Sequence, residues 1–98
     1  MKPSKRVEIV IEQQLASRMA DLLVSLGVPG YTLIPNVAGR GDRGLRRADE
    51  PTGTSTNSMF IIALDDFDLI DKIVEEIRPI LSRSCGICLV SDAQWVRH

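Results

Sequence analysis

The spacing of the apolar residues changes abruptly near the start of the chain, and this change constrains the fold more than any other feature. In residues 6–12, RVEIVIE, every second side chain is aliphatic, so Val7, Ile9 and Ile11 would share one face of a strand. Through residues 13–26 the aliphatic side chains recur every three or four positions, which predicts an amphipathic helix. A strand is therefore expected to pass directly into a helix.

The remaining chain repeats this alternation of patterns. Residues 30–37 and 58–64 return to strand-type residues, and the second of these segments is apolar at every position after its first, as in a strand covered on both faces. Helical spacing reappears over residues 67–77, and Pro79 is expected to end or kink that helix. Residues 86–90, GICLV, predict a last strand.

The resulting order β-α-β-β-α-β predicts an α+β fold of the ferredoxin-like type. Both helices would cover one face of a four-stranded antiparallel sheet, with the first and third strands at its centre. The other sheet face would then have Val10, Met59 or Phe60 and the last strand to hide from water. Self-association is the simplest way to cover such a face.

A long insert separates the second and third strands. Residues 38–56 have the sequence AGRGDRGLRRADEPTGTST, in which Leu45 is the only large aliphatic residue. Compact domains usually connect their elements with about 4–6 residues, and much longer loops are functional or disordered. The insert is therefore the first place to look for function.

Composition limits what the whole chain can do. Its 98 residues suit one domain over residues 1–98, and 12 basic against 13 acidic residues give a net charge of −1, which argues against general nucleic-acid binding. The longest apolar run, residues 59–64, is far too short to span a membrane, and no signal region follows Lys2 and Lys5. A cytoplasmic protein is expected.

The insert alternates arginines with glycines in the stretch GRGDRGLRR. Glycine lets backbone N–H groups approach an anion, and guanidinium groups match phosphate oxygens. The four arginines of this stretch are therefore candidates for a phosphate site: Arg40, Arg43, Arg46 and Arg47. The spacing and the lysine of a P-loop are absent. A solvated, mobile loop is the alternative interpretation of the same composition.

Nothing else in the sequence resembles catalytic or metal-binding machinery. Cys85 and Cys88 have CxxC spacing but are followed by strand-type residues, so we interpret them as structural. Acidic residues at the start of the second helix are expected to cap it rather than bind a metal: Asp65, Asp66 and Asp68. The chain has no interior histidine and no nucleophile motif, and we expect that it is not an enzyme and holds no metal cofactor.

With this strand order, the segment GVPGYTLIPNVAGRGDRGLR (residues 27–46) and the long loop after the second strand, the chain resembles the PII-like signalling proteins along almost its entire length. It is most similar to their inorganic-carbon, carboxysome-associated branch. The resemblance implies a homotrimer with adenine nucleotides, ADP or AMP and in some cases ATP, in clefts between subunits. The insert would be the T-loop, which reports ligand occupancy to an unidentified target protein such as a transporter or a carboxysome component.

The same resemblance assigns roles to residues of this chain. Eight residues match nucleotide-binding positions of the family. Gly39, Arg40, Gly41 and Arg43 match the base of the T-loop, and Arg46 matches its second phosphate-facing arginine. Gly86 matches the glycine that approaches the phosphates, and Tyr31 and Thr32 match the GYT positions that reach toward the neighbour's base. The segment before Gly86 lacks a lysine and the loop lacks a tyrosine, which argues against the usual 2-oxoglutarate sensing and against nucleotidyl modification.

Two further expectations concern ligands. Four arginines between positions 40 and 47 face only Asp42, a local charge of +3, and the inorganic-carbon branch implies bicarbonate as a second ligand there. RNA binding is the alternative function, because some RNA-binding domains share this strand order. The third-strand segment NSMFIIAL lacks the expected aromatic pattern, and the chain is slightly acidic, so a nucleotide sensor is favoured.

Overall fold

A computed structural model describes residues 1–41, 44–46 and 56–96. Its elements are β1 (Lys2–Glu12), the 3-10 turn η1 (Gln13–Leu15), α1 (Ala16–Ser25), β2 (Thr32–Val37), β3 (Gly39–Gly41), β4 (Gly44–Arg46), β5 (Asn57–Leu64), α2 (Phe67–Ser84) and β6 (Ile87–Trp95). The predicted β-α-β-β-α-β order is confirmed, with the short pair β3 and β4 added inside the insert.

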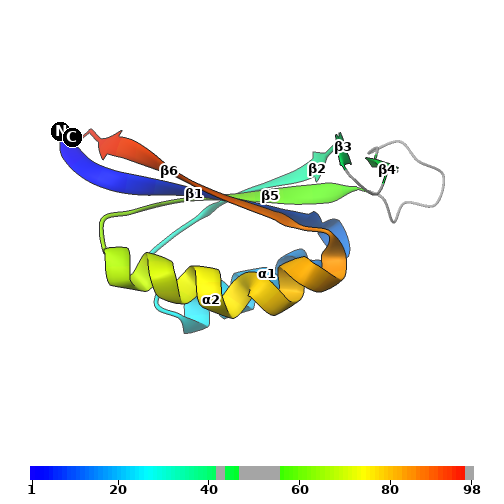
Figure 1. The fold of residues 1–98 in the computed structure, drawn as a ribbon, viewed down its shortest axis with the longest axis horizontal. Coiled ribbons are helices and arrows are strands. Elements are labelled where there is room, and N and C mark those ends of the chain that lie inside the picture. Colours follow the sequence, from blue (N-terminus) through cyan, green and yellow to red (C-terminus); the bar gives the residue numbers. More distant parts are fainter. Residues whose placement is uncertain (42–43, 47–55, 97–98) are drawn as a thin grey trace.

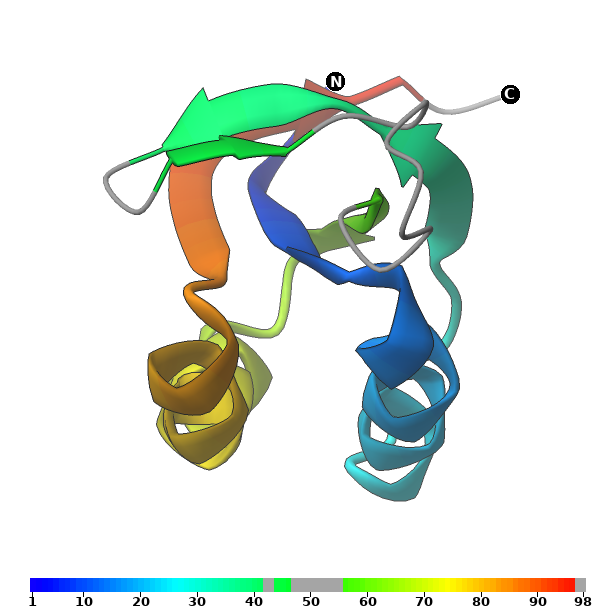
Figure 2. The same ribbon diagram turned by 90° about the vertical axis from the view of Figure 1, so that its right-hand side faces the viewer.

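Four strands form one antiparallel sheet in the order β2-β5-β1-β6 (Figure 1). The first and third strands of this sheet, β1 and β5, are central, as predicted. Both helices lie in one layer beneath the sheet, which arches over them in the end-on view (Figure 2). The second sheet, β3-β4, lies at one end of the molecule, and the start of β1 and the end of β6 lie at the other end (Figure 1).

The core lies between the sheet and the two helices. The register places Ile9 opposite Phe60 and Val7 opposite Ile62, and all four side chains are almost fully excluded from water. Ile73 of α2 is equally buried against them. The alternation seen in residues 6–12 is therefore that of a strand with one face against the helices.

The start of α2 follows its predicted capping chemistry. The side chain of Asp66 accepts a hydrogen bond from the Leu69 backbone N–H at 3.1 Å, which satisfies one of the free donors of the first turn. Asp68 lies in that turn, where its charge suits the helix dipole. Asp65 instead forms an ion pair with Lys2.

Pro79 was expected to end or kink the second helix, and it does not end it. The helix runs on to Ser84 with Pro79 inside it. Residues on both sides of the proline are held against the core: Ile77 is fully buried and Ile80 is half-buried. This packing offsets the loss of one backbone donor at the proline.

The edge strand β6 is longer than the predicted residues 86–90. It pairs with β1 as far as Trp95, which lies opposite Lys2, so β1 also begins four residues earlier than the alternation indicated. Backbone pairing between two polar segments carries both extensions. Phe60 proves to face the helices, so of the two β5 candidates it is Met59 that belongs to the open sheet face. No helix in the described ranges is long and apolar enough to cross a membrane.

Candidate functional site

The hairpin of β3 and β4 lies at one end of the main sheet. Its register pairs Gly39 with Arg46 and Gly41 with Gly44. The entry to the hairpin is irregular, because pairing between β2 and β5 shifts register between Ile34 and Val37 and Asn36 has a positive φ of 59°. Three candidate positions, Gly39, Arg40 and Gly41, thus share one short strand at the predicted base of the loop.

The arginine candidates are only partly placed. Arg40 lies opposite Leu45 in the hairpin and Arg46 lies opposite Gly39, so their backbones are on neighbouring strands. Arg43 and the side chains of Arg40 and Arg46 lie outside the described part of the structure. The described backbone therefore places two arginines close together at the hairpin without fixing what they contact.

The last residues of the insert lie beside the end of β1. The backbone N–H of Gln13 donates to the Thr56 carbonyl at 2.9 Å, and Asn57 lies opposite both Glu12 and Val37. Ile87, at the start of β6, lies opposite Val10. The loop base and the start of β6 therefore meet at the same end of the sheet.

Gly86 lies at this end, immediately after α2. Its backbone N–H donates to the Leu81 carbonyl at 3.1 Å, as part of the left-handed C-cap at Cys85. A Cβ atom on Gly86 would lie 2.7 Å from Leu81 Cδ2, 2.9 Å from Ile11 Cγ2 and 3.1 Å from the Val10 carbonyl oxygen. The structure thus gives a packing reason for glycine here, and this N–H group already has a partner.

Tyr31 and Thr32 lie on the opposite edge of the sheet from Gly86. Thr32 begins the edge strand β2 and lies opposite Ile61, and the Tyr31 ring packs edge-on to Phe60 with centroids 5.2 Å apart. The two central strands separate them from β6, which follows Gly86. Within one chain, the Tyr31–Thr32 pair and Gly86 therefore do not converge on one site.

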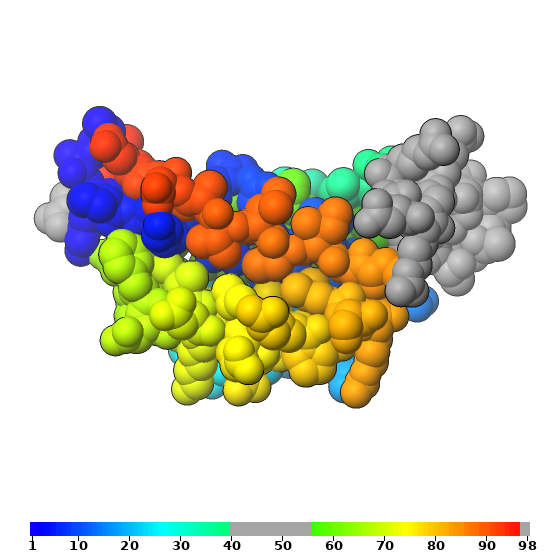
Figure 3. All heavy atoms as spheres, in the orientation of Figure 1, coloured from blue at the N-terminus to red at the C-terminus, as the bar shows by residue number. Residues whose placement is uncertain are grey.

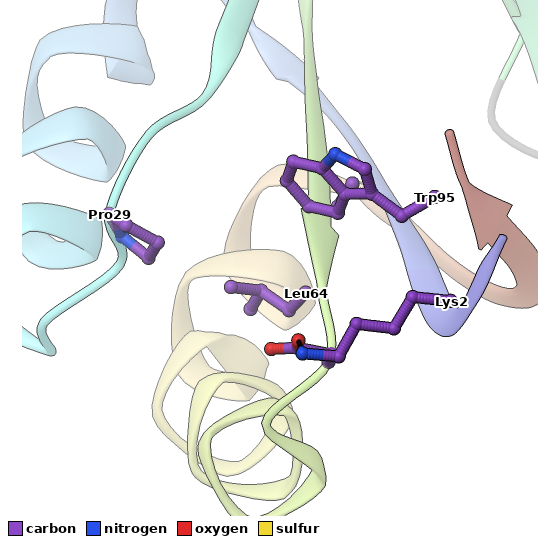
Figure 4. Close-up of a pocket in the computed structure, with 6 residues that line it drawn as sticks. Lys2, Pro29, Leu64 and Trp95 are labelled. Carbon is purple, nitrogen blue, oxygen red and sulfur yellow. Dashed lines mark ion pairs between the residues drawn. The ribbon is translucent and has the colours of Figure 1, made fainter. Parts of the chain in front are cut away.

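A hollow of about 250 Å³ lies at the end of the sheet where Lys2 of β1 pairs with Trp95 of β6 (Figure 4). Its lining comes from three strands and the segment after α1: Lys2, Pro29, Ala63, Leu64, Asp65 and Trp95. The Lys2 ammonium pairs with the Asp65 carboxylate at 2.5 Å, and both side chains remain nearly half exposed. The sequence alone does not predict this hollow; a lone tryptophan in a polar tail is its one signal there.

A second hollow, of about 310 Å³, lies between the start of α2 and the ends of β1 and β6, which meet at the left of Figure 3. Phe67 and Asp92 both line it. The Lys5 ammonium pairs with Asp92 and lies 5.7 Å from the centroid of the exposed Phe67 ring. This cluster is on the helix side of the sheet edge, away from Trp95.

The two cysteines are free thiols. Cys85 is the helix cap, whereas Cys88 faces the helices opposite Ile9, and burial raises the pKa of the Cys88 thiol. A raised pKa lowers the thiolate fraction, the opposite of what redox or metal chemistry requires. In the described ranges, no three His, Cys, Asp or Glu side chains form a group that could hold a metal ion.

Comparison with known proteins supplies the family. The structure is similar to CPII, a nitrogen regulatory PII-like protein from Thiomonas intermedia K12, bound to ADP, AMP and bicarbonate: the TM-score is 0.82 at 29% identity, over 98% of this chain and 96% of that one. The apo form of CPII gives a TM-score of 0.79 at 28% identity, over 98% and 95%. The family described as "Nitrogen regulatory protein P-II" matches residues 4–98. The chain therefore belongs to the P-II family of nitrogen regulatory proteins.

Proposed function

We propose that this protein is a cytoplasmic regulator that binds ADP or AMP, and also ATP, in clefts between the subunits of a homotrimer. Segment 38–56 would then report the bound ligand to a target protein. The ligands of CPII support this proposal, since ADP, AMP and bicarbonate are bound by a protein that is 29% identical to this chain over nearly its whole length. We expect no catalytic step, because the proposed role requires binding and release alone.

The observation that carries the proposal is the separation of the candidate residues within one chain. The hairpin and Gly86 lie at one end of the sheet, whereas Tyr31 and Thr32 lie along the opposite edge. The two central strands separate Gly86 from Tyr31 and Thr32, so a ligand that touches both would, in this proposal, bridge two subunits. A cleft between subunits satisfies this requirement, with phosphates at the hairpin and the base at the neighbour's edge.

The open face of the sheet supports self-association. Its central positions, Val10, Met59 and Ile61, are only half-buried, and the flanking Ile87 and Leu89 are 49% and 57% exposed. A contiguous apolar surface on a small protein usually marks an interface. Three copies that turn this face inward would cover it and bring strand edges of neighbouring subunits together.

We extend the proposal to bicarbonate and to inorganic-carbon metabolism, with a transporter or a carboxysome-linked protein as the target. Three net positive charges between positions 40 and 47 provide guanidinium groups for a small planar anion beside the nucleotide. Two ligands that order the same segment strengthen each other's binding reciprocally. Bicarbonate would then raise the affinity for ADP, and ADP would raise the affinity for bicarbonate.

RNA binding finds no support in the geometry. The sheet face of an RNA-binding domain of this topology presents aromatic rings to unstacked bases. Here the described open-face positions of the central strands include Glu8, Val10, Met59 and Ile61, none of them aromatic, and Phe60 is fully buried on the helix side. These side chains offer no stacking platform.

Calorimetric titration with ADP tests the proposal. Each charge-assisted phosphate contact contributes about 1.5–3 kcal/mol, so replacing both Arg43 and Arg46 by alanine should weaken ADP binding by at least about a hundredfold. Arg78→Ala is the matched control, because this arginine is exposed on α2 and pairs only loosely, at 3.7 Å, with Glu75. Equal affinity in the double variant and the control would reject the arginine site, and tight RNA binding without ADP binding would favour the alternative.

A further inference from the structure

We propose that Trp95 stacks on the adenine base, and that the hollow beneath it is the base subsite of the nucleotide cleft. This inference rests on the proposed function and adds a residue that is not among the eight candidates. Trp95 comes from the end of β6, and its indole stands over the hollow that also contacts Ala63 and Leu64 of β5 (Figure 4).

The hollow is small enough to hold a part of a nucleotide rather than the whole of it. Pockets for whole drug-sized ligands span roughly 300–1,000 Å³, whereas this one has about 250 Å³ and opens to solvent. It can therefore hold a flat ring system while ribose and phosphates extend outward. The proposed phosphate-binding hairpin would come from a neighbouring subunit, as the separation of the two groups in one chain requires.

The lining suits a base by its chemistry. Pro29, Ala63 and Leu64 provide apolar walls, and Trp95, the largest aromatic residue of the chain, is still 44% exposed. An exposed indole face is a surface on which any base can stack, because stacking needs only a π-face.

The position of the hollow joins it to residues already assigned to the nucleotide. Pro29 lies two residues before Tyr31, and Ala63 lies two residues along β5 from Ile61, the partner of Thr32. The Tyr31–Thr32 edge therefore runs directly into the hollow. Lys2, the register partner of Trp95, pairs with Asp65 across the end of the sheet and holds the start of β1 beside the indole.

Trp95 is the only tryptophan of the chain, so its emission reports on this position alone. We expect AMP and ADP to quench this emission saturably in the assembled protein. Ribose 5-phosphate, which lacks the base, should leave it unchanged. Equal quenching by AMP and ribose 5-phosphate would overturn the inference, and this test needs no variant to fold.

Variants provide the second test. Trp95→Leu should weaken ADP binding between about fivefold and 150-fold, while Trp95→Phe should retain most of the affinity. Phe67→Leu is the matched control, because it removes an exposed ring at the same end of the molecule but outside this hollow. Circular dichroism and light scattering verify that each variant folds and assembles.

The outcomes separate the two proposals. If the wild-type protein binds ADP and Trp95→Leu binds it equally tightly, the base lies elsewhere and the nucleotide-binding function stands. If the wild-type protein binds neither ADP nor AMP, the proposed function fails and the base subsite fails with it. Tighter binding to the wild-type protein than to Trp95→Leu, together with base-dependent quenching, supports both.

Discussion

Replacing Gly86 by alanine tests whether this glycine is required by packing inside the subunit. The added Cβ would lie 2.7 Å from Leu81 Cδ2 and 2.9 Å from Ile11 Cγ2, whereas carbon atoms pack best at about 3.5–4.0 Å. The Leu81 and Ile11 side chains could turn, but the Val10 carbonyl, 3.1 Å away, belongs to a central strand and cannot retreat easily.

Overpacking of this kind costs about 1–3 kcal/mol in the free energy of unfolding. For a chain of this length, 1 kcal/mol shifts the Tm by about 4–8 °C, so Gly86→Ala should lower the Tm by roughly 5–20 °C. The measurement is thermal and urea unfolding followed by circular dichroism, without nucleotide and at one fixed protein concentration, because self-association makes the Tm depend on concentration.

Gly30→Ala is the control. A Cβ on Gly30 meets no heavy atom within 4 Å, and its φ is not in the left-handed region, so alanine should be neutral or stabilising by about 0.4–1 kcal/mol. If Gly86→Ala unfolds at the same temperature as Gly30→Ala, the packing explanation is wrong. Contact with a ligand would then be the remaining reason for glycine at position 86.

Three further predictions concern the cap, the thiols and the open face. Asp66→Ala should lower the free energy of unfolding by about 1 kcal/mol, measured by urea titration, because it removes the side-chain cap of α2; no change would mean that water replaces the cap. At mildly alkaline pH, Cys85 should be alkylated by iodoacetamide before Cys88, because burial raises the pKa of Cys88 and lowers its thiolate fraction; mass spectrometry of a time course checks the order, and faster labelling of Cys88 would contradict it. Leu89→Asp should dissociate the proposed trimer in light scattering, whereas Val24→Asp, at an equally exposed position on α1, should not; loss of the trimer in both variants would disprove the role of the open face.

The sequence was sufficient for the topology because its apolar spacing records which face of each element is buried. Val7, Ile9 and Ile11 lie where their alternation placed them, and the apolar β5 is a central strand. What the sequence could not provide was the extent of β6, because pairing through polar residues depends on backbone hydrogen bonds to β1 and leaves no hydrophobic pattern. The continuation of α2 beyond Pro79 could not be predicted either, because the packing that stabilises this part of the helix comes from other elements.

The candidate site was predictable only as a set of residue types. Glycines and arginines at the insert indicated an anion site without showing which end of the sheet they occupy. The assignment of Gly86 to a ligand stays a prediction, and the packing reason for a glycine there, next to Leu81 and Ile11, could not be seen in the sequence. The hollow at Trp95 joins β1, β5, β6 and the segment before β2, so no local spacing could indicate it. Such a site depends on the sheet register rather than on any single segment.

The register also explains why a regulator of this fold would gain from binding its ligand between subunits. The hairpin lies at the Glu12 end of β1, and the hollow lies at the Lys2 end of the same strand, which is eleven residues long. A fully paired central strand is rigid, so the two ends of one subunit cannot approach each other to close on a nucleotide. Under the proposed function, the nucleotide would instead lie between the hairpin of one subunit and the hollow of its neighbour. In the proposed function, the ligand would contact the insert and the subunit interface together, and this shared contact would couple nucleotide binding to segment 38–56.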